Sequence, residues 1–458
     1  MPEILITIIA FFILIGVLVF IHELGHFLAA RWTGMRAEVF AVGIGPRVMG
    51  WNRINGFSFG KLPDDIELGE DTDYRVAALP IGGYVKILGM IDESMETEFT
   101  TKEPEPWEFR SKNTLQKAFV LSAGVIMNIL LAIVLFAGLK FFHGDEIWNT
   151  TIIGPLPQKG ATAVAYDAGL RAGDQVIAIN GDSVHDYQEI RDQIYVSQAG
   201  EDLRFQIERD GMPISISIPR SEIPANPSKE GEILLPDNLG IEIESVLGAS
   251  AAYNAGLEIG DLVTSVDGQR ISSTDEFITY VSGHKEESIL LTILRGGERL
   301  TKTATPNEDG KLGIHIKTEY VGPKTQRTYG FVAAISGGFK DVGKQLSLIT
   351  GLIGDLFTGK QKLKESIAGP VEIFNMAGKT FVLGPVLFLT LMASLSVMLA
   401  FLNILPIPAL DGGHLVFVFI EGIIRREVPL KVRIAAQQVG FLILLVFMVY
   451  LFYNDFTR

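Results

Sequence analysis

The chain has no cysteine among its 458 residues, which excludes both disulfide bonds and thiolate metal sites. Basic residues are in the minority, because 39 Lys and Arg stand against 53 Asp and Glu, giving a formal charge of −14. This balance argues against nucleic acid as a partner, since phosphate binding needs a basic surface. Any metal ion must therefore be held by Asp, Glu or one of the seven histidines.

The N-terminus lacks the basic segment, short apolar core and cleavage site of a signal peptide. Met-Pro-Glu passes directly into an apolar run that begins at Ile4, and we expect this run to be retained. With 48% hydrophobic residues, the chain is predicted to be a membrane protein with a large soluble part. The segments long and apolar enough to span a bilayer are about 4–30, 118–142, 383–405 and 434–453.

The first span contains His22-Glu23-Leu24-Gly25-His26. Two histidines four apart lie on one face of a helix and can bind one metal ion, and the glutamate beside the first is the general base in zinc hydrolases. An ordinary polar pair is the alternative. Ionisable residues inside a membrane are costly enough to indicate function. The motif therefore predicts a zinc site within the membrane, with Glu23 as catalytic base.

Basic residues near the span ends predict the orientation. Arg425, Arg426, Lys431 and Arg433 place the loop between the last two spans in the cytoplasm. Both termini and the stretch 143–382 are then outside. Since a helix rises 1.5 Å per residue, His22 lies roughly 27 Å into the first span, near the cytoplasmic side.

The third span ends in Asn403-Ile404-Leu405-Pro406-Ile407-Pro408-Ala409-Leu410-Asp411-Gly412-Gly413-His414. The prolines break the helix, and irregular backbone at membrane depth is tolerated where it lines a cavity. Asp411 emerges at the depth of the histidine pair, so we expect it to be the third metal ligand, with His414 as the rival. Asn403 is suited to donating a hydrogen bond to an oxyanion, or to bridging helices.

A cytoplasm-side region follows the first span. It contains Gly43-Ile44-Gly45-Pro46 and then Leu79-Pro80-Ile81-Gly82-Gly83-Tyr84-Val85-Lys86-Ile87-Leu88. The second stretch predicts a short strand entered through glycines, whose exposed edge can pair with an extended peptide. An ordinary re-entrant or interfacial hairpin is the alternative.

The external region contains an internal repeat. Ala168-Gly169-Leu170-Arg171-Ala172-Gly173-Asp174 recurs as Ala255-Gly256-Leu257-Glu258-Ile259-Gly260-Asp261, and each copy is followed by an Asn-Gly or Asp-Gly turn, a helix and a hairpin. Two β-rich domains that resemble PDZ domains are expected, binding chain termini by strand addition or acting as spacers or a size filter. Apolar spacing over 329–359 predicts an amphipathic helix on the membrane surface or against a PDZ domain.

Taken together, the fold class is a polytopic α-helical membrane protein with four transmembrane helices and two tandem PDZ-like β-rich domains. The predicted parts are 1–142 with the first two spans and the cytoplasm-side β region, PDZ-like domains at 143–220 and 221–318, an amphipathic helical linker at 319–382, and the last two spans at 383–458.

These motifs closely resemble those of the site-2 protease family, over essentially the whole chain. The resemblance implies an intramembrane zinc metalloprotease of the bacterial inner membrane, with periplasmic termini and PDZ domains and one Zn²⁺ per chain. It also implies substrates, namely single-pass membrane proteins already trimmed by a first protease, such as an anti-sigma factor, and remnant signal peptides.

Carried over by position, His22, His26 and Asp411 match the zinc ligands and Glu23 matches the catalytic glutamate. Asn403 matches an asparagine implicated in substrate binding. Gly43 to Gly45 match the family's membrane-associated loop, and its substrate-clamping strand corresponds to Gly82, Gly83, Tyr84, Val85 and Lys86.

The residues alone are also compatible with two other classes of function. A non-catalytic scaffold or receptor would use its PDZ domains and hold a structural metal. A transporter would also have broken helices and acidic residues at membrane depth, but four spans without an inverted repeat argue against it.

Overall fold

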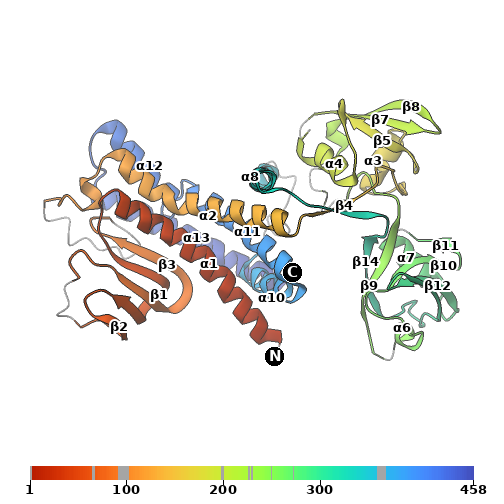
Figure 1. Cartoon of the computed structure of the whole chain (residues 1–458), viewed down its shortest axis with the longest axis horizontal. Helices are drawn as coiled ribbons and strands as arrows, with labels where there is room; N and C mark the ends of the chain where they lie inside the picture. The colour runs from red at the N-terminus through yellow and green to blue at the C-terminus, as the bar shows by residue number, and fades with distance from the viewer. Residues whose placement is uncertain are drawn as a thin grey trace. The chain divides into compact units, whose positions relative to one another are not determined.

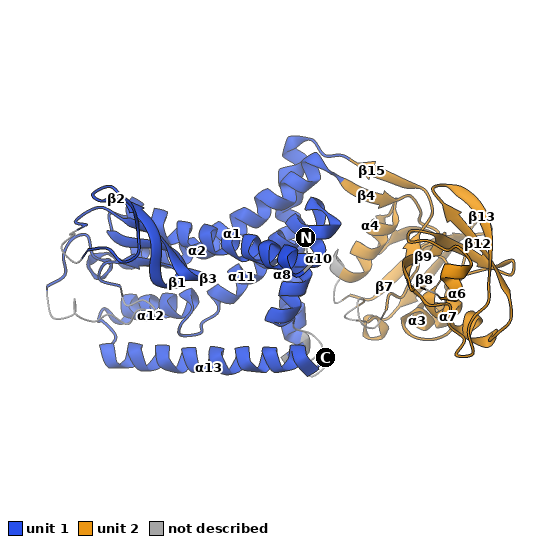
Figure 2. Ribbon diagram, turned by 90° about the horizontal axis from the view of Figure 1, so that it is seen from below, with its two compact units in different colours: residues 1–144, 328–458 blue, residues 145–327 orange. Residues whose placement is uncertain are grey.

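The structure is a computed structural model that describes residues 3–63, 68–90, 103–197, 201–224, 227, 231–248, 250–271, 273–357 and 368–457. The chain divides into two compact units, coloured separately in Figure 2. Unit 1 comprises 1–144 and 328–458, and unit 2 comprises 145–327.

Unit 1 is built on apolar helices. Among the described residues four are long and apolar enough to span a membrane: α1 (Glu3–Trp32), α2 (Thr114–Phe142), α11 (Pro385–Ile404) and α13 (Leu430–Thr457). This confirms the four predicted segments. Helix α2 is central, since α1, α11 and α12 (Asp411–Ile424) all pack against it. Figure 1 shows α1 and α2 running side by side.

The helix predicted over 329–359 is present as α8 (Phe331–Phe357), but its partner differs from the expectation. Val342 and Ile349 are buried with Ile133 of α2 and Val397 of α11. The apolar stripe of α8 therefore packs on apolar helices of its own unit. A second helix, α10 (Pro370–Leu383), completes this part of unit 1 and contacts α1.

A sheet of β1 (Ala37–Asn52), β2 (Gly56–Phe59) and β3 (Asp73–Ile87) packs beside α1, in the order β2-β1-β3. The predicted short strand is thus the end of a 15-residue strand. Residues 39–42 of β1 each lie opposite two residues of β3, as Phe40 does with Tyr74 and Val85. Residues 39–42 therefore run between two stretches of β3, and 83–87 form an edge.

Glycines make the corners of this folded ribbon. Gly43, Gly45 and Gly82 have φ values of +93°, +96° and +79°, which side chains with a Cβ rarely adopt. An added Cβ at Gly43 would also lie 2.6 Å from the carbonyl oxygen of Leu79. Gly43, Gly45 and Gly82 are thus explained by the turns they make.

Unit 2 contains two β-rich domains that share a helix, a strand with a short partner strand, a second helix and a hairpin in the same order, as the sequence repeat predicts, and the second domain adds β9 and β14. In the first, β5 (Gln175–Ile179), β6 (Asp182–Ser183), β7 (Leu203–Arg209) and β8 (Met212–Ile218) form a sheet in the order β6-β5-β7-β8. In the second, the sheet order is β13-β12-β10-β9-β14, with β11 beside β10. Its strands are β9 (Leu239–Val246), β10 (Leu262–Val266), β11 (Gln269–Arg270), β12 (Ile289–Arg295), β13 (Glu298–Ala304) and β14 (Ile314–Tyr320).

Short helices complete each domain. The first has α3 (Ala161–Asp167) and α4 (Tyr187–Asp192), which continues as a π-helical turn over Gln193–Ser197, and the second has α6 (Ala251–Asn254) and α7 (Thr274–Gly283). A two-stranded ribbon of β4 (Asp145–Trp148) and β15 (Lys324–Arg327) joins the ends of the unit.

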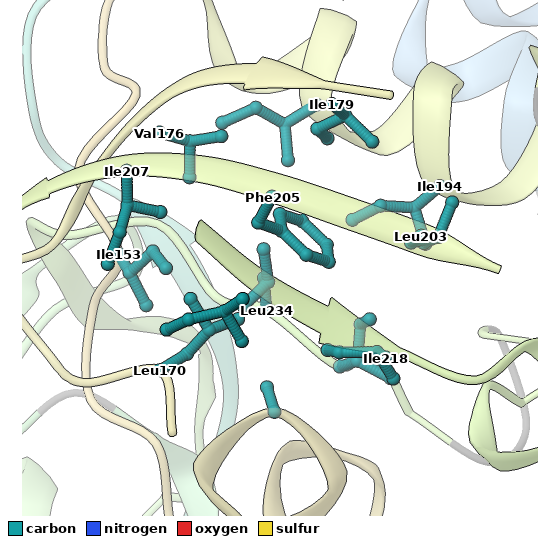
Figure 3. Packing of buried hydrophobic residues seen from close by; sticks show 14 of the residues in the cluster. Ile153, Leu170, Val176, Ile179, Ile194, Leu203, Phe205, Ile207, Ile218 and Leu234 are labelled. Carbon is teal, nitrogen blue, oxygen red and sulfur yellow. The ribbon is translucent and has the colours of Figure 1, made fainter. Parts of the chain in front are cut away.

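Each domain has its own apolar core. Figure 3 shows that of the first domain, where Phe205 of β7 lies among Leu170, Ile218 and Leu234. This core also includes Ile223 and Ile233, so its packing extends past residue 220. The boundary predicted between 220 and 221 is therefore too early for the buried residues of the first domain.

Candidate metal centre

Three side chains converge where α1 meets the start of α12. Nε2 of His22 lies 3.2 Å and Nε2 of His26 lies 3.4 Å from Oδ2 of Asp411. The two imidazole nitrogens are 3.3 Å apart. The three potential ligand atoms therefore form a nearly equilateral triangle, contributed by opposite ends of the chain.

This triangle fits a zinc ion. Zinc binds nitrogen and oxygen at about 2.0–2.1 Å, and tetrahedral geometry then separates two ligands by roughly 3.3 Å. Oδ2 of Asp411 is buried and accepts no hydrogen bond from the described residues, as expected of an atom that faces a cation. His414, the predicted rival, is not part of this cluster. Two imidazoles and one carboxylate leave a fourth position, the donor set of a catalytic zinc site.

The broken segment after α11 delivers Asp411. An added Cβ at Gly412 would collide with the carbonyl oxygens of Ile404 and Leu405, and one at Gly413 with that of Ile407. The two glycines therefore let the first turn of α12 lie against the loop before it. Ala409 has a φ of +92°, which costs about 1–3 kcal/mol for a residue with a Cβ. This strain lies two residues before the carboxylate.

Helix α2 supports both imidazoles, a contribution that no sequence motif indicated. Nδ1 of His26 donates to the carbonyl oxygen of Val120 at 2.9 Å, and Nδ1 of His22 lies 3.1 Å from the amide nitrogen of Asn128. Gly124 stands between them, and an added Cβ there would lie 2.6 Å from Cε1 of His22. The only available signal was Asn128 itself, a polar residue within an apolar span.

Glu23 and Asn403 line the same cavity as the triangle, with a volume of about 240 Å³. Nδ2 of Asn403 lies 3.4 Å from Nε2 of His22, so this amide is at the metal cluster. Glu23 faces the sheet, since an added Cβ at Gly83 would lie 3.0 Å from Cγ of Glu23. The general base and the asparagine predicted from sequence thus share one cavity with the three ligands.

The free edge of β3 forms one wall of this cavity through Gly82, Gly83, Tyr84 and Val85. Gly83 brings the strand close to α1, because a Cβ there would also lie 2.8 Å from Cγ1 of Val19. The other predicted substrate residues lie elsewhere. Lys86 pairs with Glu38 at 3.2 Å, and neither Lys86, Gly43 nor Gly45 lines the cavity.

The sequence profile of peptidase family M50 matches residues 10–447. The chain belongs to peptidase family M50. It is therefore a metalloprotease, as the resemblance to site-2 proteases implied.

Several curated proteins are similar along their whole length. The chain is 31% identical to the regulator of sigma-E protease RseP of Escherichia coli K12, over 98% of both chains. It is 29% identical to a putative zinc metalloprotease of Vibrio cholerae, over 100% of both. Among solved structures, the PDZ domain of an SdrC-like protein from Listeria innocua matches 17% of this chain and 92% of its own, with 26% identity and a TM-score of 0.16. That TM-score supports no argument about the fold.

Proposed function

We propose that this M50 peptidase is a site-2-type intramembrane protease, in which His22, His26 and Asp411 hold one Zn²⁺ per chain. The observation that carries the proposal is the triangle of candidate ligand atoms, 3.2–3.4 Å on each side, whose carboxylate oxygen accepts no hydrogen bond from the described residues. Zinc bound there supplies Lewis-acid polarisation of the scissile carbonyl and an acidified water.

The side chains around the cluster have separate roles. Glu23 takes a proton from the attacking water and returns it to the leaving amine. Asn403 donates its Nδ2–H to the oxygen on which negative charge develops. Both residues line the cavity that contains the cluster.

The free edge of β3 is the proposed holder of the substrate. A helical substrate has its amides bonded internally, so it must unwind before its peptide bond can be attacked. Among the described residues no strand pairs with Gly83, Tyr84 and Val85 on the side away from β1, and pairing there would stabilise an extended substrate. The chain recognised this way is a single-pass membrane segment, of the anti-sigma factor or remnant signal-peptide type that the sequence resemblance implied, cut after a first protease.

The proposed setting is the bacterial inner membrane, with both termini periplasmic and the metal cluster near the cytoplasmic side. The repeated domains of unit 2 are proposed to be periplasmic PDZ domains that bind chain termini or filter substrates by size. The basic residues around α12 and α13 support this orientation.

The test compares wild type with Glu23→Gln in purified full-length protein. Wild type is expected to contain one zinc and to cut a model single-span substrate. Glu23→Gln is expected to keep the zinc and lose proteolysis. Proteolysis retained in that variant, or purified wild type without zinc, would refute the enzyme mechanism and favour a scaffold.

A further inference from the structure

One stripe of helix α2 faces both histidines. Val120, Gly124 and Asn128 are spaced four apart, so they lie on one face of the helix. Gly124 leaves room for the rings, and the residues one turn to either side each contact one Nδ1 atom. The stripe thus contacts the Nδ1 atoms of both rings, whose Nε2 atoms lie beside Asp411.

The two contacts differ in chemistry. The partner of His26 is a backbone carbonyl, which only accepts, so Nδ1 of His26 carries the proton and Nε2 presents a lone pair. His22 needs the same tautomer, because its Nε2 atom is the one beside Asp411. Its partner must then accept a hydrogen bond as well.

Asn128 can meet this requirement. Its side-chain amide has one accepting and two donating groups on a planar end of nearly symmetrical shape, so a half-turn exchanges oxygen and nitrogen. Oδ1 of Asn128 is buried and has no hydrogen-bond partner among the described residues, while Nδ2 is the atom 3.1 Å from His22 Nδ1. A half-turn gives the orphaned oxygen a donor and gives His22 the tautomer that binds metal.

The position of Asn128 is fixed from a third helix. Its backbone oxygen accepts a hydrogen bond from Oγ of Ser396 on α11 at 2.8 Å, and both residues are fully buried. Helices α1, α2 and α11 therefore meet at this asparagine. A role limited to joining helices is the competing explanation, and it involves the backbone oxygen instead of the side chain.

We propose that Asn128 is a positioning residue whose side-chain oxygen accepts the Nδ1 proton of His22 and so directs Nε2 toward the metal. The inference rests on the proposed function, since it takes zinc to bind at the His22–His26–Asp411 cluster. Residues in this supporting role change metal affinity by about 10–100-fold when removed.

The experiment measures zinc affinity of the full-length protein in detergent by competition with a chromogenic chelator. Asn128→Leu keeps similar bulk without an acceptor, and roughly 10–100-fold weaker binding is expected. Asn128→Asp offers only acceptors when ionised, and affinity equal to or tighter than wild type is expected. Ser396→Ala, which removes the contact to the backbone oxygen, is the matched control and is expected to bind zinc within about twofold of wild type.

A second readout separates positioning from folding. Cobalt-substituted wild type is expected to show two slowly exchanging, paramagnetically shifted imidazole N–H proton signals, and Asn128→Leu to keep only that of His26. Zinc affinity of Asn128→Leu within twofold of wild type, or Asn128→Asp as weak as Asn128→Leu, would overturn this inference alone. Wild type that binds no zinc would instead overturn the proposed function.

Discussion

Both units bury carboxylates beside basic side chains, but they satisfy them differently. Asp174 in unit 2 accepts from Nε and Nη2 of Arg209 at 2.6 and 2.7 Å and from the backbone N–H of Arg171 at 2.8 Å. The second repeat reproduces this arrangement with Asp261 and Arg295. In unit 1, by contrast, Oδ2 of Asp411 lies between two imidazole nitrogens and accepts no hydrogen bond from the described residues.

This difference separates a structural carboxylate from a proposed metal ligand. A carboxylate that accepts from one guanidinium and a backbone amide has donors on both of its oxygens. The pKa of its guanidinium partner is raised by that hydrogen bond, as for Arg209 and Arg295. A buried oxygen without a donor is costly unless a cation completes it. Backbone groups show a similar contrast. Among the described residues, Gly83, Tyr84 and Val85 of β3 are paired with β1 on one side only, whereas a strand inside a sheet is paired on both sides.

The largest expected effect is from Asp411→Asn. The amide keeps the shape but loses the charge and a strong metal-binding oxygen, so zinc affinity should fall by more than the roughly 100-fold expected of a supporting residue. Proteolysis should become undetectable. Zinc content and cleavage of a single-span substrate are the measurements, with Asp174→Asn as the reciprocal control that keeps both. Zinc bound normally by Asp411→Asn would remove the distinction between the two carboxylates.

The second effect is on stability. Asp174→Asn leaves Arg209 without its partner, and breaking a buried ion pair costs about 3–5 kcal/mol, which we reduce to roughly 2–4 because Arg209 is partly exposed. Denaturant unfolding and hydrogen exchange over β5 and β7 in the full chain measure this loss. Asp167→Asn, at an exposed position of the same domain, should change stability little. Equal stability of these two variants would contradict the structural role of Asp174.

A smaller effect tests the backbone edge. Adjacent backbone N–H groups of a strand point to opposite sides of it. Proline has no N–H, so one of the two variants Tyr84→Pro and Val85→Pro removes a donor from the outer edge of β3, and the other removes a donor that faces β1. The variant that loses the outer-edge donor should cut a membrane substrate roughly 2–12-fold more slowly, which is the rate change expected from the loss of one hydrogen bond to the substrate. An already extended peptide should be affected less. Unchanged cleavage of the membrane substrate by both variants would exclude pairing with β3.

The smallest effect concerns backbone groups outside the strands that already have hydrogen-bond partners. In the first β domain Ile233 N–H donates to the Tyr195 hydroxyl at 2.9 Å, and Tyr187 donates to the Leu234 carbonyl at 2.7 Å. Tyr195→Phe removes one of these bonds and should cost about 1 kcal/mol at neutral pH. Denaturant unfolding measures this loss, with Tyr253→Phe at an exposed site as control.

Tyr195 also predicts a pH dependence. Burial raises the pKa of Tyr195 to about 12, above its ordinary value of 10.0. Because the neutral form is favoured in the fold, the stabilisation is complete below pH 10 and is lost as the pH rises through 12. Absorbance of phenolate during alkaline titration should show one fewer late-titrating tyrosine in Tyr195→Phe. Identical titrations would mean that Tyr195 is accessible to water.

Several parts of this structure could be predicted because their signals are local. The apolar spans, the His-Glu-x-x-His spacing, the Pro-x-Pro break and the Gly-Asp repeats each depend on residues close in sequence. The lengths and directions of the predicted spans were enough to predict that His22 and Asp411 lie at the same depth in the membrane. The ligand roles themselves stay predictions until metal is measured.

Other parts depend on contacts that leave no local pattern. Residues 39–42 pair with two separate stretches of β3, because the chain turns at Gly43, Gly45 and Gly82. These two stretches are too far apart in sequence for a local pattern to show that they share one partner. The burial of Val342 against α2 needs knowledge of which helix is nearby. Asn128 is similarly informative only once α2 is known to face His22.

The placement of the cluster has a consequence for biosynthesis. In the proposed site, a nascent chain that has made only α1 and α2 holds two imidazoles and a glutamate but not the proposed third ligand, because Asp411 is translated after α11. The N-terminal half alone would then be unable to attack neighbouring membrane proteins. Proteolytic competence would arise only when α12 docks on α2, so the order of synthesis itself would protect the membrane from an unfinished protease.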